Sequence, residues 1–464
     1  MKSTLLALAA IAVLAANPAC AEDANGYWSG SIANSLKVNL QFSKAADGRW
    51  EGTLSVPQQG LTTKVDKLVV TDDQISFALV EPQAGFAARW NEQEKAWAGT
   101  WSQNGRTAPL VLTRADAPAL KPKRPQEEAI AARTPTYNSS EVRFTNDAAQ
   151  VALAGTFTVP QGKGPFPAVV LVHGSGPLDR NEVVFDHKLF LVLADHLSRK
   201  GIAVLRYDKR GIGKSTGAYD TATSFDLAGD AEAALRFLRG RAEVDTRHIG
   251  IIGHSEGGLI APLVASRDAA LGFVVMLAGP GVRGELLMVE QLALSAKAAG
   301  APDEVVAARR TLNTALFAAL ASEPQLQTAR LKVSLVMEEA ARKGALPPGI
   351  DKDWARHFST PWFHAFLRHE PGPALQATRQ PILVLNGELD RQVPAAMDLA
   401  AIRTALKGNA RAVVKELPKL NHLFQTAVTG SGAEYFAIEE TIAPVALDTV
   451  TDWIHATLGQ ASVK

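Results

Sequence analysis

Two different hydrophobic periods divide this chain. Between residues 26 and 115, apolar and polar residues alternate, as at Leu36, Val38, Leu40 and Phe42, which is the period of a half-buried strand. Turn-forming residues such as Asp72-Asp73 separate the short apolar runs. The pattern predicts a separate all-β unit over residues 22–115, built as an antiparallel meander or a small barrel.

Five of the eight tryptophans lie in this predicted β unit: Trp28, Trp50, Trp90, Trp97 and Trp101. Because large aromatic side chains dominate the burial of apolar surface, we expect them to form the core of the unit. The alternative is that they line a groove for a carbohydrate or a lipid.

After residue 139 the period changes. Continuous apolar runs at Ala168–Val172, Ile202–Leu205 and Ile249–Ile252 are typical of buried strands, and Phe225–Arg239 has helical spacing. Strands that alternate with helices predict an α/β fold, with a doubly wound, mostly parallel sheet over residues 139–464.

The interval from about 281 to 380 lacks a strand pattern. Leu286–Ala299, Glu304–Ser322 and Gln327–Lys343 have amphipathic helical spacing, which predicts a helical cap over the strand ends. A helical domain with no part in binding is the alternative. Trp362–Phe366 would suit a wall of the substrate pocket or the seam between cap and sheet.

Residues 116–138 connect the two predicted units. Pro118, Pro122, Pro125 and Pro135 fall there among charged residues. Such a composition is typical of an extended, partly stiff linker.

The first 21 residues are predicted to be a signal peptide. Lys2 precedes an apolar run, Leu5–Ala16, and Ala19-Cys20-Ala21 reads as a small-residue cleavage site. The run is shorter than the roughly 20 residues that span a membrane, so we expect no stable membrane insertion. The mature chain would begin at Glu22 in the periplasm or outside a bacterium, while lipidation at Cys20 is the alternative.

Composition excludes several kinds of site. Cys20 is the only cysteine, so the mature chain would hold no disulfide, no cysteine nucleophile and no thiolate metal site. A net charge of +1 gives no reason to expect a nucleic-acid partner. The composition makes no prediction of an oligomeric state.

Ser255 is the candidate nucleophile. It lies in Gly253-His254-Ser255-Glu256-Gly257, after an apolar run and before a helical stretch, which is the context of a nucleophile elbow. Side chains at 253 and 257 would collide with the neighbouring strand and helix. A glycine-rich strand–helix turn without catalytic function is the alternative.

A serine nucleophile needs a base and an acid that orients the base, in the chain order Ser, acid, His. Asp390 follows a late apolar run and is the favoured acid, with Glu388 as the alternative. His422 follows the last predicted strand and is the candidate base, whereas His455 lies in a terminal helical pattern.

The oxyanion hole requires two backbone donors. We expect them to be the N–H groups of Glu256 and Ser175, with Gly174 or Gly176 as alternatives to Ser175. His173 and His254 are interpreted as structural residues. No metal or organic cofactor is required by this chemistry.

Charged residues near the predicted strand ends are interpreted as braces. Asp208 and Arg210 could touch a substrate, but a structural ion pair is the favoured interpretation. Asp179, Arg180 and Glu182 are assigned the same bracing role.

From residue 139 onward the chain resembles the α/β-hydrolase fold, and more closely the bacterial carboxylesterases and serine-aminopeptidase-like hydrolases. The similarity is carried by three segments: His173–Glu182, Asp208–Ser215 and the elbow Gly253–Gly257. Asp390 and His422 fall where that family has its acid and base. The N-terminal β unit looks like the accessory domain that precedes such esterases.

The sequence therefore predicts an exported serine hydrolase, and the resemblance implies carboxylesterase activity on small-molecule esters. A serine peptidase on the same fold is the first alternative, and thioesterase or lactonase activity also stays open. The second alternative is a non-catalytic binding module of the cell envelope.

Overall fold

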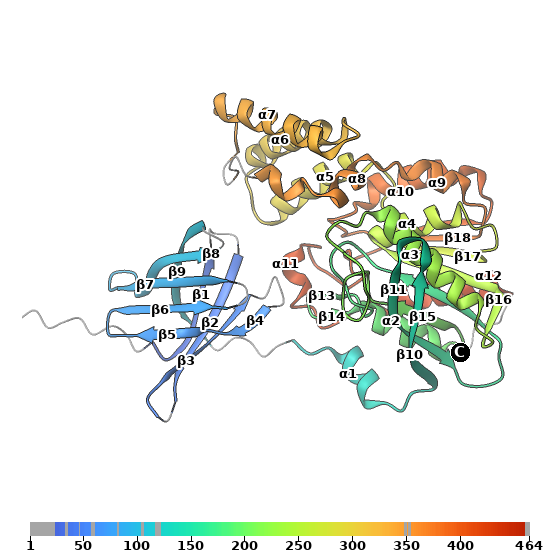
Figure 1. Ribbon diagram of the computed structural model, residues 1–464, viewed down its shortest axis with the longest axis horizontal. Coiled ribbons are helices and arrows are strands. Elements are labelled where there is room, and N and C mark those ends of the chain that lie inside the picture. Colours follow the sequence, from blue (N-terminus) through green and yellow to red (C-terminus); the bar gives the residue numbers. More distant parts are fainter. Residues whose placement is uncertain are drawn as a thin grey trace, which may run out of the picture. The chain divides into compact units, whose positions relative to one another are not determined.

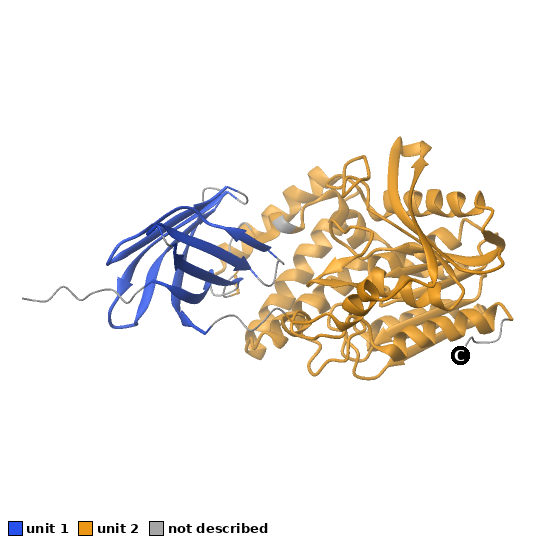
Figure 2. Cartoon of the chain, turned by 90° about the horizontal axis from the view of Figure 1, so that it is seen from below, with its two compact units in different colours: residues 1–121 blue, residues 122–464 orange. Residues whose placement is uncertain are grey.

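The computed structural model describes the following residues: 24–32, 36–45, 47–56, 61–80, 83–103, 106–116, 122–347, 350 and 354–459. It divides into two compact units, residues 1–121 and 122–464 (Figure 2). The predicted signal peptide, with Cys20, lies outside the described residues. Among the helices that are described, none is both long and apolar enough to span a bilayer.

The N-terminal unit is one nine-stranded antiparallel sheet in the order β4-β3-β2-β1-β9-β8-β7-β6-β5. Its strands are β1 Gly26–Ile32, β2 Leu36–Lys44, β3 Trp50–Val56, β4 Leu61–Lys64, β5 Asp66–Val70, β6 Gln74–Leu79, β7 Ala84–Asn91, β8 Ala96–Gln103 and β9 Arg106–Ala115. Val65, between β4 and β5, donates a backbone hydrogen bond to Gly52 of β3. The sheet is therefore nearly closed, and the prediction of a barrel-like all-β unit is confirmed.

The tryptophans of this unit form its core. Trp28, Trp97 and Trp101 are buried, and Trp50 and Trp90 pack against the same cluster. The rings of Trp90 and Trp97 meet edge to face, with centroids 5.1 Å apart. The prediction of an aromatic core is confirmed.

The C-terminal unit contains an eight-stranded sheet in the order β10-β11-β15-β12-β16-β17-β18-β19. Its strands are β10 Tyr137–Asn146, β11 Val151–Pro160, β12 Phe166–Val172, β15 Ala203–Tyr207, β16 Val244–His254, β17 Phe273–Leu277, β18 Ile382–Gly387 and β19 Ala412–Leu417. β10 and β11 are antiparallel to their neighbours, and the other strands run parallel. β13 (Val183–Val184) and β14 (His187–Lys188) form a separate hairpin.

Helices cover both faces of this sheet because successive strand residues point to opposite sides. On β12, Val169 and Leu171 join one apolar cluster with α2 and α12, whereas Val170 joins the other with α3, α4, α9 and α10 (Figure 1). The helices are α2 Leu189–Arg199, α3 Ser224–Arg239, α4 Glu256–Ala265, α9 Pro371–Ala377, α10 Ala395–Ala405, α11 Gly432–Tyr435 and α12 Pro444–Thr457, with short 3-10 turns at η2 Asp147–Ala149 and η4 Leu406–Gly408. The predicted doubly wound, mostly parallel sheet is confirmed.

The cap is a helical insertion between β17 and β18. It comprises α5 Gly284–Ala298, α6 Asp303–Ala321, α7 Leu326–Arg342, η3 Trp354–Phe358 and α8 Pro361–Arg368 (Figure 1). Phe317 of α6, Phe358 of η3 and Phe363 of α8 meet in its apolar core. The three predicted cap helices are present within one or two residues of their predicted bounds.

The predicted linker 116–138 needs correction. Pro125 opens a helix, α1 (Pro125–Ala132), because proline suits the first helical position. Arg124, just before it, is buried and donates to the carbonyl oxygen of Phe436 at 2.9 Å. Glu127 accepts hydrogen bonds from Lys188 N and Thr441 Oγ1. Residues 122–138 are thus part of the C-terminal unit.

Candidate active site

Ser255 occupies a strained turn between β16 and α4. Its φ is +52°, which a residue with a side chain rarely adopts. Its backbone N–H donates to Leu277 O at 2.8 Å, and its carbonyl accepts from Gly258 N at 2.8 Å. The hydroxyl is thereby presented at the carboxyl end of the sheet, at the start of a helix.

The two glycines that flank this turn have no room for a side chain. A Cβ on Gly253 would lie 1.9 Å from Gly257 O, and a Cβ on Gly257 would lie 1.9 Å from Val172 O. The predicted collisions at both positions are confirmed.

Asp390 and His422 are brought together. His422 Nδ1 lies 2.8 Å from Asp390 Oδ2, and both residues are buried. The other carboxylate oxygen, Asp390 Oδ1, accepts from the backbone N–H groups of Gln392 and Val393 at 2.8 Å each. These donors fix the carboxylate, so the imidazole is held in one orientation.

Glu388, the alternative acid, is exposed and turned elsewhere. Its Oε2 accepts a hydrogen bond from Lys419 N at 2.9 Å. The carboxylate that contacts the His422 ring is therefore that of Asp390.

The elbow and the His422 loop are joined through His254. The rings of His254 and His422 have centroids 5.0 Å apart, and His254 Nε2 donates to the backbone carbonyl of His422 at 3.0 Å. Ser255 follows His254 directly in the chain, so it is adjacent to the residue that contacts His422. Within the part of the chain that the structure describes, Ser255 Oγ makes no hydrogen bond to the His422 ring.

His254 is buried between two hydrogen-bond acceptors. Its Nδ1 lies 3.1 Å from Glu182 Oε1, and both of its ring nitrogens face acceptors. Burial acts to lower the pKa of His254, but the Glu182 carboxylate outweighs it, so that the pKa is raised. Burial likewise acts to raise the pKa of Glu182, and His254 outweighs it, so that this pKa is lowered.

The predicted oxyanion loop lies against Ser255. A Cβ on Gly174 would be 3.2 Å from Ser255 Cβ. Gly174 N donates to Glu182 Oε1 at 2.6 Å, so this N–H is engaged and Gly174 was a wrong alternative. Ser175 is exposed next to it, and Glu256 opens α4 directly after Ser255.

His173 is structural, as predicted. It is buried, with its ring 5.1 Å from that of Phe190 and 5.4 Å from that of Tyr207. Burial lowers its pKa to about 4, so the ring is neutral at physiological pH.

Asp208 and Arg210 do form structural ion pairs, but with other partners than each other. Asp208 Oδ2 pairs with Arg180 Nη2 at 2.8 Å, and Arg210 Nε pairs with Asp230 Oδ2 at 2.7 Å. The expectation of a bracing role was correct, and the implied pairing was wrong because sequence proximity does not fix which side chains meet.

The side chain of Glu256 joins the elbow to the cap. Its Oε1 accepts from Ser224 Oγ at 2.6 Å and from Trp362 Nε1 of α8 at 2.5 Å. Its Oε2 lies 3.3 Å from Lys209 Nζ. Trp362 therefore lies at the seam between cap and sheet, one of the two positions expected for it.

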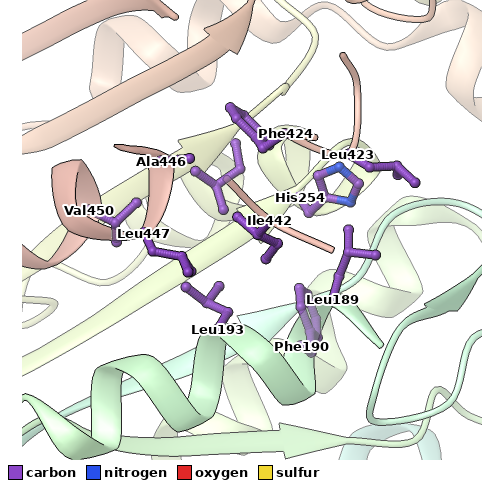
Figure 3. Close-up of a pocket in the computed structure, with 11 residues that line it drawn as sticks. Leu189, Phe190, Leu193, His254, Leu423, Phe424, Ile442, Ala446, Leu447 and Val450 are labelled. Atoms are coloured by element: carbon purple, nitrogen blue, oxygen red, sulfur yellow. The ribbon is translucent and has the colours of Figure 1, made fainter. Parts of the chain in front are cut away.

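Behind the elbow lies an apolar cavity of about 20 Å³ (Figure 3). It is lined by α2, α12 and the segment after His422, and His254 borders it. A volume of this size holds one water molecule at most. The cavity is thus a packing gap under the His422 loop.

No group of three or more Asp, Glu, His or Cys side chains in the described ranges could hold a metal ion.

The alpha/beta hydrolase family model matches residues 169–433. These residues contain the elbow, the predicted oxyanion loop, Asp390, His422 and the cap. The chain therefore belongs to the alpha/beta hydrolase family.

Esterase EstD of Thermotoga maritima is 30% identical to this chain over 298 residues, which cover 64% of this chain and 63% of EstD. The chain thus matches somewhat less than two thirds of that relative. Among solved structures, the esterase Pf2001 of Pyrococcus furiosus is 17% identical, covers 69% of this chain and 93% of its own, and has a TM-score of 0.42. Est1E of Butyrivibrio proteoclasticus is 15% identical, with coverages of 69% and 100% and the same TM-score of 0.42. Such scores are no evidence of a shared activity.

Proposed function

We propose that this chain hydrolyses carboxylic esters through Ser255, His422 and Asp390. The observation that carries the proposal is the 2.8 Å contact between His422 and Asp390, whose buried carboxylate also accepts two backbone hydrogen bonds. It is accompanied by a serine at φ +52° in the adjoining elbow. The similarity to an esterase supports the choice of ester as the substrate class.

In the proposed reaction, His422 takes the proton of Ser255 as Oγ bonds to the ester carbonyl carbon. The carbonyl oxygen becomes an oxyanion, which the N–H groups of Ser175 and Glu256 stabilise. The C–O bond to the alcohol then breaks, and His422 returns the proton to the leaving oxygen. Water repeats the sequence on the acyl-enzyme and releases the acid.

In this scheme Asp390 fixes the tautomer of His422 and stabilises its positive charge. Ser255 Oγ has to rotate or approach to meet His422. Catalytic hydrogen bonds are often long before a substrate is bound, which is consistent with the contact being absent here.

Labelling with a fluorophosphonate tests the proposal. The wild-type protein should react in a one-to-one ratio and lose activity towards a short nitrophenyl ester, and Ser255→Ala should neither react nor hydrolyse. A wild-type protein that stays unlabelled would contradict the serine mechanism. Faster hydrolysis of an aminoacyl anilide than of the ester would contradict the ester assignment and favour a peptidase.

Export is the second part of the proposal, and it is supported by the pattern of residues 1–21 alone. The mature protein, expressed in a bacterium with its own leader, should be found in the periplasm or medium and begin at Glu22. Edman sequencing that finds Met1 on the active protein would contradict export. A lipid-modified Cys20 at the N-terminus would contradict cleavage after Ala21.

A further inference from the structure

Lys209 is a buried cation that the proposed reaction leaves without a role. It follows β15 in the segment Asp208–Ser215, and its side chain is only 3% exposed. Its Nζ donates to Gly174 O at 2.6 Å and to Glu256 Oε2 at 3.3 Å. Burying an ammonium group is costly unless it is paired and hydrogen-bonded, and here both conditions are met.

The bond to Gly174 O acts on the proposed oxyanion donor of Ser175. The C=O of Gly174 and the N–H of Ser175 are the two ends of one peptide group. Because that group is planar, a donor that fixes the direction of the carbonyl also fixes the direction of the N–H. A cation on the carbonyl oxygen also polarises the peptide, which makes the N–H a stronger donor.

The bond to Glu256 reaches the side chain of the residue that carries the second proposed donor. In the proposed reaction Glu256 supplies its backbone N–H to the oxyanion. Its side chain is buried, and Oε1, the carboxylate oxygen not bonded to Lys209, accepts hydrogen bonds from Ser224 and Trp362. A single ammonium group therefore contacts the Gly174–Ser175 peptide group, which carries the first proposed donor, and the side chain of Glu256, the residue that carries the second. The centroid of the Tyr219 ring lies 5.6 Å from the same Nζ, so the ammonium group also faces an aromatic ring.

We propose that Lys209 is a positioning residue that orients and polarises the oxyanion hole formed by Ser175 and Glu256. The inference rests on the proposed ester hydrolysis and deepens it. Lys209 acts through the peptide group and does not touch the substrate. The competing explanation is that Lys209 only neutralises the buried Glu256.

The first comparison is Lys209→Met against Lys214→Met. Lys214 belongs to the same segment, but its side chain is 65% exposed and pairs with Glu141. Each variant is assayed with a short nitrophenyl ester and with an alkyl boronic acid, whose tetrahedral adduct on Ser255 places an anionic oxygen in the hole. For Lys209→Met we expect kcat and boronate affinity to fall by about 10- to 100-fold, less than for loss of a donor itself. KM should stay within about threefold, and Lys214→Met should match the wild type.

The second comparison removes the competing explanation. In a Glu256→Gln background the carboxylate that pairs with Lys209 is gone, so a purely neutralising lysine would be dispensable. We expect Lys209→Met to lower kcat and boronate affinity by the same factor in that background, relative to Glu256→Gln alone. The melting temperature of Lys209→Met reports whether that variant folds. If it does not fold, the double variant and Glu256→Gln still provide the comparison of kcat and boronate affinity.

Equal kcat and boronate affinity for the double variant and Glu256→Gln would overturn the role of Lys209. A rise in KM with unchanged kcat would overturn it as well. A wild-type protein that neither hydrolyses esters nor binds the boronate would instead contradict the proposed function itself.

Discussion

At the scale of single residues, the site is organised around two buried carboxylates with different tasks. Asp390 holds the imidazole of His422. Glu182 holds the ring of His254 and also accepts a hydrogen bond from Gly174 N. The first was foreseeable from the order of serine, acid and histidine along the chain. The second was not, because Glu182 and His254 are 72 residues apart and nothing in the sequence pairs them.

Replacing Asp390 should impair the proposed chemistry without unfolding the chain. Asp390→Asn keeps the shape of the side chain but offers the wrong partner to His422 Nδ1, so we expect kcat to fall by roughly 10³- to 10⁴-fold. Steady-state kinetics with a nitrophenyl ester measures this. Glu388→Gln, two residues away, is the matched control and should retain wild-type kcat. Similar losses in both variants would contradict the assignment of Asp390.

The Glu182–His254 pair predicts a pH dependence of stability. Folded His254 binds its proton more tightly than unfolded His254, so its contribution is complete below about pH 6.5, its ordinary pKa, and falls as pH rises through the raised value. The contribution of Glu182 is complete above about pH 4.5 and falls as pH drops through its lowered pKa. Stability from this pair is therefore greatest between these two values.

Thermal melting between pH 6.5 and 9, compared between the wild type and His254→Gln, isolates the His254 part. Burial raises the pKa of Asp398 from 3.8 to about 7. The stabilising contribution of protonated Asp398 is therefore mostly gone by about pH 7, and the comparison of the two proteins removes the rest. We expect the melting temperature of the wild type to decline with rising pH, and that of His254→Gln to be nearly flat. An equal decline in both proteins would show that His254 is not the group responsible.

At the scale of helices and strands, hydrophobic period predicted most of what is observed. The buried strands β12, β16 and β17 and the cap helices α5 to α7 are long or continuous enough for their period to be clear. Helix α1 was missed because Pro125 and the prolines on either side of the helix suggested an extended segment, although Pro125 is only the first residue of a helix. The hydrophobic period of a sequence does not specify which helices pack against each other, so the hydrogen bond from Trp362 to Glu256 was not predictable.

Trp362→Phe should loosen the cap at its attachment to α4. The substitution keeps an aromatic ring stacked on Phe366, whose centroid is 5.2 Å away, but removes the N–H that Glu256 accepts. A hydrogen bond to a charged group contributes about 1.5–3 kcal/mol, so amide exchange in α8 should accelerate by on the order of tenfold or more.

The control is Trp354→Phe, which alters a ring contact inside the cap, with Phe358, and leaves the Glu256 contact intact. Hydrogen exchange followed by mass spectrometry should show α8 protected as in the wild type. Unchanged protection of α8 in Trp362→Phe would mean that the bond to Glu256 does not hold the cap.

At the scale of the whole chain, two separate cores define two units. The N-terminal unit has its own aromatic core, and the C-terminal unit has apolar clusters on both faces of its sheet. The change of hydrophobic period revealed this division in the sequence. The exact boundary was harder to place, because the polar contacts of Arg124 and Glu127 reach residues more than 60 positions away.

Truncations should distinguish the two possible boundaries. A protein of residues 122–464 should fold and keep the melting temperature of the C-terminal unit. A protein of residues 139–464 loses α1 and leaves Lys188 N and Thr441 without the carboxylate of Glu127, so its melting temperature should be several degrees lower. Differential scanning calorimetry compares the two, and equal transitions would contradict a structural role for α1.

The contact between Glu256 and Trp362 has a consequence for protein engineering. A chimera that exchanges residues 284–368 for the insertion of another hydrolase replaces the cap helices, but it also withdraws the indole from Glu256. The incoming segment must then carry its own donor at the corresponding place, or the carboxylate of Glu256, beside Ser255, loses one of its hydrogen-bond donors. Grafts chosen by this criterion should retain turnover more often than grafts chosen by length or sequence similarity alone.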